Sequence, residues 1–206
     1  LLNAFDISTP LTSCHEHNER SKAVQIAERM LAENIDVAVT TDAGTPCISD
    51  PGSVLVREAA ERGIPVVAVS GPTAMASALS VSGMDISEFT FYGFLPRQKN
   101  ELREKLTDMA RHSKIAVVHE SPHRVIELLQ QVQAVLPHTY VSASCDLTKK
   151  FEQTLRGPVE QVLRQLEENP KADKGEYCLC LRWAEEDIPA PEAAREDISL
   201  EARLFD

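Results

Sequence analysis

Apolar and polar positions alternate along the chain with two different periods. In residues 18–32 the apolar side chains recur every three or four positions, which is the spacing of an amphipathic helix. The runs 35–40 and 64–69 are instead rich in β-branched residues, which is typical of buried strands. The pattern predicts helices over 18–32, 53–62, 73–82, 98–112, 121–136 and from 157 onward, and strands over 35–40, 64–69, 89–92, 114–119, 139–144, 151–155 and 175–183.

The order of these elements predicts an α/β fold. Helices and strands alternate through most of the chain, and such alternation is typical of parallel sheets covered by helices. Residues 84–96 follow a tight series of helix–strand repeats and are the best hinge between two lobes. The sequence therefore predicts a first α/β domain over 1–86, a second over 87–184 and an acidic tail over 185–206.

Length and composition narrow the class of protein. The chain has 206 residues, of which 43% are hydrophobic and 26% charged, as in soluble proteins with a sizeable core. Its longest apolar runs are strand-sized and its start lacks a secretory pattern, so neither a membrane span nor secretion is predicted. Five cysteines favour reduced thiols in the cytoplasm over a disulfide framework.

The net charge of −11 is unevenly distributed. Residues 183–206 hold eight acidic and two basic side chains, whereas residues 93–124 hold seven basic and four acidic ones, a local excess of +3. Because nucleic-acid binding depends on local patches, the acidic total does not exclude RNA. The charge pattern leaves an RNA partner open without requiring one.

Two polar loops follow predicted strands, where ligands gather in open α/β sheets. In the loop 42–52, Gly44 lets the backbone approach a ligand closely, and prolines stiffen the chain around it. The loop 70–74 is of the same type. A structural interpretation, in which Asp50 or Ser53 caps the next helix, carries about equal weight. Neither loop has the motif of a P-loop or of a dinucleotide fingerprint.

Four further clusters allow a functional and a structural interpretation. Residues 120–124 form another strand-to-helix turn, where ligand contact and helix capping are equally weighted. Lysines in 146–151 could handle a proton or a phosphate, although a solvated charge run is favoured. The His-x-His at 15–17 lacks the spacing of a helical zinc motif. Cys178 and Cys180 share one strand face without a second pair, which favours a core strand over a zinc site.

Seven of the motifs occur in an order that is similar to that of a known family. They are Ser-Cys-His-Glu-His-Asn-Glu at 13–19, Asp-Ala-Gly-Thr-Pro-Cys-Ile-Ser-Asp-Pro-Gly at 42–52, Ser-Gly-Pro-Thr-Ala at 70–74, Gly-Phe-Leu-Pro at 93–96, Glu-Ser-Pro-His-Arg at 120–124, Leu-Thr-Lys-Lys-Phe-Glu at 147–152 and Lys-Gly-Glu at 174–176. Over 1–183 the chain closely resembles the ribosomal RNA small-subunit methyltransferase I family of the tetrapyrrole methylase superfamily. The motif at 42–52 is the most specific.

This resemblance implies a fold and an activity. The fold has two α/β/α domains with mostly parallel sheets and a cofactor cleft between them, and the first domain holds the cofactor. The activity is S-adenosylmethionine-dependent methylation of the ribose 2′-hydroxyl of a cytidine in small-subunit ribosomal RNA or the 30S particle. The resemblance also implies a cytoplasmic homodimer, and methyl transfer of this kind needs no metal.

The resemblance carries over to individual residues. The cofactor-binding positions that it implies are Gly44, Thr45, Pro46, Ile48, Thr73, Ala74 and Glu120. A ribose hydroxyl is a weak nucleophile that benefits from a nearby base or cation, and the candidates for this role are Glu120, His123 and Lys149. The candidate phosphate contacts are Arg97, Lys99, Arg103 and Arg124.

The chain also departs from the family pattern. Family members begin with a strand and a Thr-Pro-Ile-Gly-Asn-Leu loop that forms one wall of the cleft, and here this first strand is absent because the chain starts after it. Cys47 stands where a glycine is usual. Two alternatives follow: a methylase of the same fold for a tetrapyrrole (corrin or porphyrin) or another small molecule, and an inactive cofactor-binding fragment. A large apolar cleft would favour the small molecule, whereas a basic cleft mouth would favour RNA.

Overall fold

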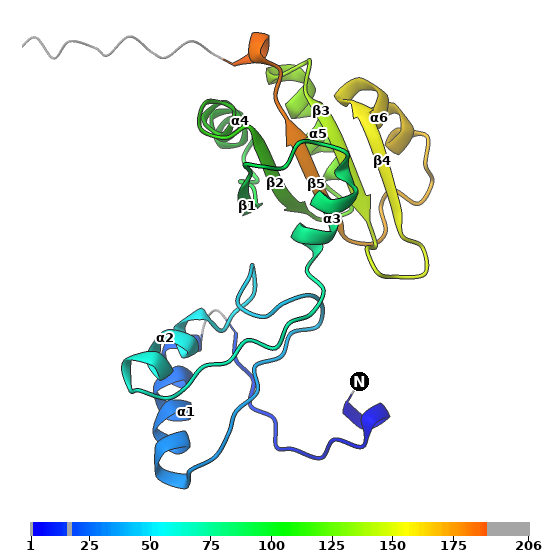
Figure 1. Ribbon diagram of the computed structural model, residues 1–206. Coiled ribbons are helices and arrows are strands. Elements are labelled where there is room, and N and C mark those ends of the chain that lie inside the picture. Colours follow the sequence, from blue (N-terminus) through cyan, green and yellow to red (C-terminus); the bar gives the residue numbers. More distant parts are fainter. Residues whose placement is uncertain (1, 16–17, 189–206) are drawn as a thin grey trace, which may run out of the picture. The chain divides into compact units, whose positions relative to one another are not determined.

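The chain folds into two compact units, Leu1–Thr73 and Ala74–Asp206. The computed structural model describes residues 2–15 and 18–188 (Figure 1). Most of the predicted acidic tail lies outside the described residues. The division falls just before a helix that is predicted from the sequence to belong to the first domain, 1–86. Among the described residues, no helix is both long enough and apolar enough to cross a membrane.

The first unit is built on two packed helices, α1 (Glu19–Glu33) and α2 (Ser53–Glu61), with a short 3₁₀ helix, η1 (Leu2–Phe5), near its start. The predicted helices 18–32 and 53–62 are therefore confirmed to within one residue. Small side chains make most of the contact between α1 and α2. Alanines of this kind let two helices approach closely. The buried apolar residues are Ala23 and Ala27 on α1 and Leu55 and Ala59 on α2.

The strands predicted over 35–40 and 64–69 are wrong for this structure, which assigns no strand to either run. Their β-branched side chains are exposed: Val37 is 40% exposed, Val67 82% and Val69 92%. A strand is stable only when a neighbour pairs with its backbone groups. Among the described residues of the first unit no such ladder forms, so the local preference is not realised.

The second unit contains a five-stranded sheet in the order β1-β2-β5-β3-β4. The strands are β1 (Thr90–Phe94), β2 (Ile115–Glu120), β3 (Tyr140–Cys145), β4 (Gln153–Pro158) and β5 (Tyr177–Arg182). Only β1 and β2 pair in parallel, and the other three pairings are antiparallel. The α/β class is confirmed, but this sheet is not mostly parallel. One reason is that the loop 146–152 between β3 and β4 is too short for a parallel crossover.

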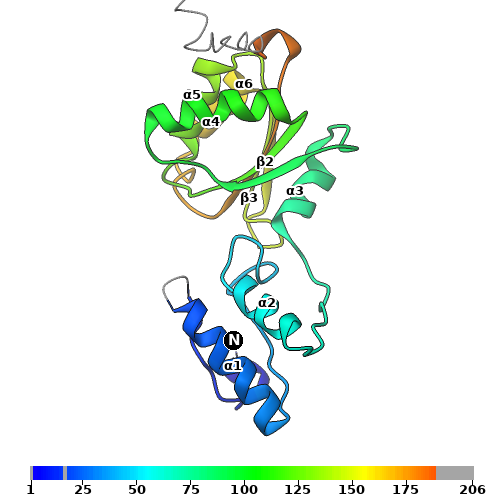
Figure 2. The same cartoon turned by 90° about the vertical axis from the view of Figure 1, so that its left-hand side faces the viewer.

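Helices cover both faces of this sheet (Figures 1 and 2). The helix α3 (Ala74–Ser82) packs on one face, against Ile115, Val117 and the thiols of β5. The other face is covered by α4 (Lys99–His112), α5 (Val125–Val135) and α6 (Val159–Glu167), which form the larger core. Alternate residues of β2 thus serve two cores, as expected for a strand buried on both faces.

The helix predicted from residue 121 begins later than expected, because residues 121–124 form a turn. Both Arg124 N and Val125 N donate hydrogen bonds to the Ser121 carbonyl, at 3.1 Å and 3.2 Å. The helix α5 therefore starts at Val125, and Ser121 is not its N-cap. This turn leaves the end of β2 and matters for the site below.

Candidate functional site

The loop 42–52 of the first unit presents open backbone at Gly44. This glycine has φ of +74°, and a Cβ added there would meet no atom of the described structure within 4 Å. The Thr45 hydroxyl donates to the Pro72 carbonyl at 3.4 Å, so the loops 42–52 and 70–73 lie side by side. The structure thereby brings together the two loops that the sequence singles out, with Pro46 half-buried and Ile48 37% exposed.

A carboxylate from α1 holds the far end of this loop. Glu19 Oε1 accepts hydrogen bonds from Gly52 N at 2.7 Å and Val54 N at 3.0 Å, so it caps α2 from outside. Neither Asp50 nor Ser53 provides this cap, because Gly52 occupies the N-cap position. Sequence reasoning missed Glu19, whose only signal was its place in the motif 13–19.

The loop also needs glycine at its end. Gly52 has φ of +132°, and a Cβ there would lie 2.6 Å from Cys47 Sγ. Cys47 itself has φ of +68° and Ser49 φ of +64°, a region that L residues rarely adopt. These tight turns and the Glu19 cap fix the loop, so the structural interpretation of 42–52 and the ligand interpretation are compatible.

In the second unit, β2 and β3 end at the edge of the sheet where β5 begins. Glu120 at the end of β2 is opposite Tyr177 on β5, and Tyr177 is opposite Cys145 at the end of β3. With strands about 4.8 Å apart, the Glu120 and Cys145 backbones are about 10 Å apart. The edge therefore brings together the turn 121–124, which contains His123, and the loop 146–152, which contains Lys149. No hydrogen bond or ion pair joins Glu120, His123 and Lys149 directly within the described chain.

Glu120 is a buried carboxylate with one oxygen that accepts no hydrogen bond from the described residues. Its side chain is 1% exposed, and its Oε1 accepts from Ser121 N at 2.7 Å and lies 3.5 Å from Arg124 Nη1. Its Oε2 is buried and has no hydrogen-bond partner among the described residues. An unmade hydrogen bond of this kind costs about 1–3 kcal/mol, so an incoming donor at Oε2 would be stabilising.

Arg124 has structural partners. Besides Glu120, its guanidinium donates from Nη2 to the Pro96 carbonyl at 3.1 Å, which ties the turn 121–124 to the loop after β1. Its side chain is 21% exposed. Arg124 therefore braces the edge of the sheet and differs from the other predicted phosphate contacts.

Lys149 is held as a cation. Its ammonium lies 2.8 Å from Glu176 Oε2 and 3.3 Å from Asp146 Oδ1. The hydrogen bond to Glu176, followed by that to Asp146, raises the pKa of Lys149 above its usual value of 10.5. A general base must be unprotonated before it acts, so Lys149 fits the stabilisation of negative charge and not proton removal.

The three other predicted phosphate contacts lie at the start of α4 or just before it. Arg97, Lys99 and Arg103 are exposed, and none makes an ion pair with a described residue. Arg103 donates to the neutral Gln131 side chain at 2.9 Å. Their positive charge is therefore not neutralised by a direct carboxylate partner.

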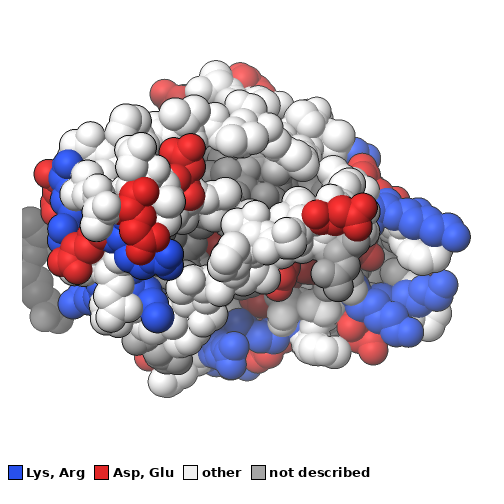
Figure 3. Space-filling view, turned by 90° about the horizontal axis from the view of Figure 1, so that it is seen from below, with Lys and Arg blue, Asp and Glu red and all other residues white. Residues whose placement is uncertain are grey.

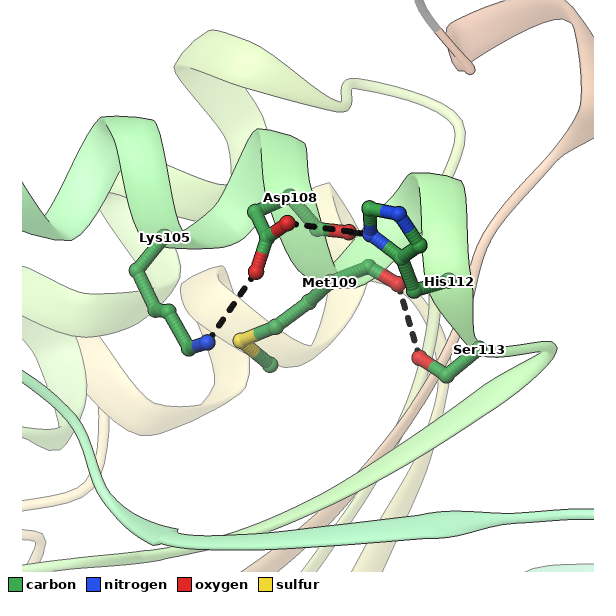
Figure 4. Close-up of polar contacts among 5 residues, drawn as sticks. All are labelled: Lys105, Asp108, Met109, His112 and Ser113. Carbon is green, nitrogen blue, oxygen red and sulfur yellow. Dashed lines mark hydrogen bonds and ion pairs between the residues drawn. The ribbon is translucent and has the colours of Figure 1, made fainter.

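Two other lysines of residues 93–124 are neutralised by nearby carboxylates. Lys105 pairs with Asp108 at 3.0 Å, and the same carboxylate lies 2.9 Å from His112 (Figure 4). The hydrogen bond from Lys105 lowers the pKa of Asp108. Lys114 pairs with Glu88 at 2.7 Å. On the face drawn in Figure 3, basic side chains likewise lie among acidic ones in several small groups.

All five cysteines are free thiols. Cys178 and Cys180 are buried under α3, and burial raises the pKa of each thiol to about 12. The core-strand interpretation of this pair is thus confirmed. Within the described chain no three or more potential metal ligands cluster, and His17 lies outside it.

Comparison with known proteins identifies the family. The family model for Tetrapyrrole (Corrin/Porphyrin) Methylases matches residues 2–163, and the chain belongs to this family. Among solved structures, the methyltransferase CobJ superposes with a TM-score of 0.58 at 16% identity, covering 85% of this chain and 74% of that one. Diphthine synthase superposes with a TM-score of 0.64 at 11% identity, covering 87% and 71%. These two likenesses show the fold.

Sequence relatives narrow the membership. The chain is 37% identical over 199 residues to ribosomal RNA small subunit methyltransferase I of Halalkalibacterium halodurans, covering 97% of the chain and 68% of the relative. It is 37% identical over 208 residues to the protein of that name from Escherichia coli O157:H7, covering 99% and 72%. With the Vibrio cholerae protein the values are 39% over 181 residues, 87% and 62%. The chain therefore belongs to the ribosomal RNA small subunit methyltransferase I family, and it spans between 60% and 72% of the length of such relatives.

Proposed function

We propose that this chain is the main part of an enzyme that methylates the ribose 2′-hydroxyl of a cytidine in small-subunit ribosomal RNA. The substrate would be the RNA or the 30S particle, the methyl donor S-adenosylmethionine, and the enzyme a cytoplasmic homodimer. The observation that carries the proposal is the 37% identity over 97% of the chain to a protein named for this class of activity.

The residues present fit the proposed cofactor. Gly44 leaves its backbone accessible on an open side, and Thr45 stands beside it. The helix α3 begins at Ala74, so backbone N–H groups of its first turn, next to Thr73, are available to a carboxylate. Glu120 Oε2 is a buried acceptor in need of a donor. The cofactor-holding set that we propose is Gly44, Thr45, Pro46, Ile48, Thr73, Ala74 and Glu120.

The chemistry divides between the cofactor and the chain. S-adenosylmethionine, when bound, supplies an electrophilic methyl group on a sulfonium. The chain must hold the ribose oxygen in line with that methyl, and positioning of this kind supplies much of the rate. Lys149 stays protonated and would stabilise negative charge developing on the oxygen. His123 is exposed in the turn 121–124, so its ring nitrogens are accessible as a hydrogen-bond partner for the ribose hydroxyl.

The basic residues support an RNA substrate over a small one. Arg97, Lys99 and Arg103 expose positive charge without carboxylate partners in the described chain, as phosphate contacts require. Arg124, which is already engaged by Glu120 and Pro96, would act chiefly by holding this edge in place.

Transfer of a tritiated methyl group from S-adenosylmethionine tests the proposal. We expect incorporation into 30S particles or their RNA, located at a ribose by nuclease digestion, and none into a porphyrin or corrin precursor. Incorporation into the tetrapyrrole alone would establish the small-molecule alternative. Cofactor binding by calorimetry without incorporation into either substrate would identify an inactive cofactor-binding fragment.

A further inference from the structure

The loop 146–152 exposes an aromatic side chain at the same sheet edge as Glu120. Phe151 is 71% exposed. Single exposed apolar side chains are common on protein surfaces and by themselves indicate nothing. The surroundings of Phe151 distinguish it, because hydrogen bonds anchor the loop and two cations lie near the ring.

The loop is held by short-range hydrogen bonds. Lys149 N donates to the Asp146 carbonyl at 2.9 Å, and Glu152 N donates to the Lys149 carbonyl at 3.1 Å. Thr148 N donates to the Glu152 carboxylate at 2.7 Å. Asp146 and Thr148 adopt φ values of +52° and +67°, so the turn is tight on both sides of Leu147. Phe151 is thus presented by a defined turn.

The loop is also fastened to the start of β5. The Lys149 ammonium reaches Glu176 at 2.8 Å, and Asp146 N donates to the Glu176 carbonyl at 3.1 Å. Gly175, which precedes Glu176, lies so close to the loop that a Cβ on it would be 2.8 Å from both Asp146 Oδ2 and Cys145 Sγ. Because these contacts already hold the loop, a ligand that binds the aromatic ring would cost little loop conformational entropy.

Two lysine ammonium groups lie over the ring, and they would turn toward the adjoining phosphates when a base stacks there. Lys150 Nζ lies 5.6 Å from the Phe151 ring centroid and Lys171 Nζ lies 5.8 Å from it. Both side chains are exposed, and neither makes an ion pair with any residue that the structure describes. An exposed aromatic side chain with two exposed cations at its ring matches the chemistry of a nucleotide, which offers a flat base and a phosphate.

We propose that Phe151, Lys150 and Lys171 form a stacking site for one unpaired nucleotide of RNA. The base stacks on Phe151, and the two ammonium groups contact the adjoining phosphates. This inference rests on the proposed function, because it places a piece of the substrate RNA. A base within a duplex has no free face to offer, so the site selects single-stranded or looped RNA. The site lies at the edge where β2 and β3 end, and it would hold a nucleotide near Glu120 and Lys149.

Binding of a fluorescent single-stranded 12-nucleotide RNA to the 206-residue chain tests this site. Phe151→Ala should weaken binding about 5- to 150-fold, as expected for loss of one stacked base, with little change in salt dependence. Phe151→Tyr should retain binding. Replacing Lys150 and Lys171 with alanine should reduce the slope of log affinity against log salt by about 1 to 2. Phe5→Ala is the matched control, since Phe5 is 69% exposed in the first unit.

A direct optical signal complements the affinities. The chain has one tryptophan, Trp183, which is 7% exposed, so Phe151→Trp adds a second, exposed fluorophore. We expect single-stranded RNA to quench the added emission and the duplex of the same sequence to quench it much less. Equal affinities of Phe151→Ala and Phe5→Ala, or an unquenched Trp at position 151, would overturn the site.

The outcomes separate this inference from the proposed function. If the unchanged chain methylates 30S particles and Phe151→Ala does so with the same kcat/KM, the stacking site is wrong and the function stands. If Phe151→Ala loses single-strand affinity while the unchanged chain methylates no ribosomal RNA, the stacking site stands and the function is wrong.

Discussion

The two units bury their apolar side chains to very different extents. Among the described residues, the first unit has four buried apolar side chains, three of them alanines. The second unit encloses large side chains such as Leu106, Leu129 and Leu179 on one face of its sheet, and a smaller cluster on the other. The first unit carries the loop with open backbone, and the second carries the charged sheet edge.

This contrast shows that similar local patterns lead to different outcomes when the partners differ. Residues 115–120 and 64–69 have comparable apolar character, yet the former are flanked by β1 and β5, whereas the latter have no paired neighbour in the described first unit. Burial of large side chains between layers is the main source of stability. We therefore expect the first unit to open at lower free energy than the second.

The largest effect should come from removing a large side chain from the second unit. Leu129 is fully buried on α5, and Leu129→Ala should lower the free energy of unfolding of this unit by about 2–5 kcal/mol. Urea titration followed by Trp183 emission measures it, because Trp183 belongs to the second unit. Leu55→Ala in the first unit is the comparison and should leave the Trp183 transition in place. A shift of equal size in both variants would mean that the units unfold as one.

Cofactor affinity should depend on Gly44 of the first unit. Gly44→Val should weaken S-adenosylmethionine binding about 5- to 150-fold, because the side chain would occupy the open space beside the loop. Gly63→Val is a matched control: Gly63 has φ of +71°, and a Cβ there also meets nothing within 4 Å in the described structure. Both variants suffer the same backbone strain, so calorimetry on the pair isolates the loss of ligand contact. Equal affinities would remove Gly44 from the site.

Much of the second unit could be predicted from local pattern alone. The helix expected over 98–112 is Lys99–His112, and the strand expected over 114–119 is Ile115–Glu120. Strand direction could not be predicted, because β5 pairs with two strands far from it in sequence. The failed strands 35–40 and 64–69 have the same cause, since a ladder depends on a partner that the local sequence does not reveal.

The site could be predicted as a set of loops but not as a set of contacts. The sequence brings Lys149 forward as a candidate for proton handling, yet its partner Glu176 is 27 positions away and holds it as a cation. The cap from Glu19 to Gly52 joins residues 33 positions apart. Such pairings decide the role of a charged side chain, and only the folded chain shows them.

RNA affinity should depend on the second unit. Replacing Arg97, Lys99 and Arg103 together with alanine should flatten the salt dependence of RNA binding by about 2 to 3 units of slope, because each phosphate contact releases about one counterion. S-adenosylmethionine affinity should be nearly unchanged, since these side chains are not on the proposed cofactor loops. Fluorescence anisotropy at several salt concentrations provides the measurement. An unchanged slope would make this segment a solvated helix face and strengthen the small-molecule alternative.

The smallest effect concerns the described C-terminal end of the second unit, where His138 pairs with the short 3₁₀ helix η2 (Glu185–Asp187). His138 Nδ1 lies 2.8 Å from Asp187 Oδ1, and its backbone N–H donates to Oδ2 at 2.6 Å. The hydrogen bond to Asp187 raises the pKa of His138 above its ordinary value of 6.5.

The raised pKa fixes the direction of a pH effect. The folded state binds the proton more tightly than the unfolded state, so the added stability is fully present below about pH 6.5 and is lost as the pH rises through the folded value. Asp187→Asn should therefore destabilise the second unit more at about pH 5.5 than at about pH 8.5, by a small amount because the imidazole is exposed and screened. The urea midpoint from Trp183 emission measures the stability of the second unit at each pH. Titration of the imidazole by NMR measures the pKa of His138 in the folded state. An imidazole pKa in the unchanged chain at or below that in Asp187→Asn would show that the pair does not form in solution.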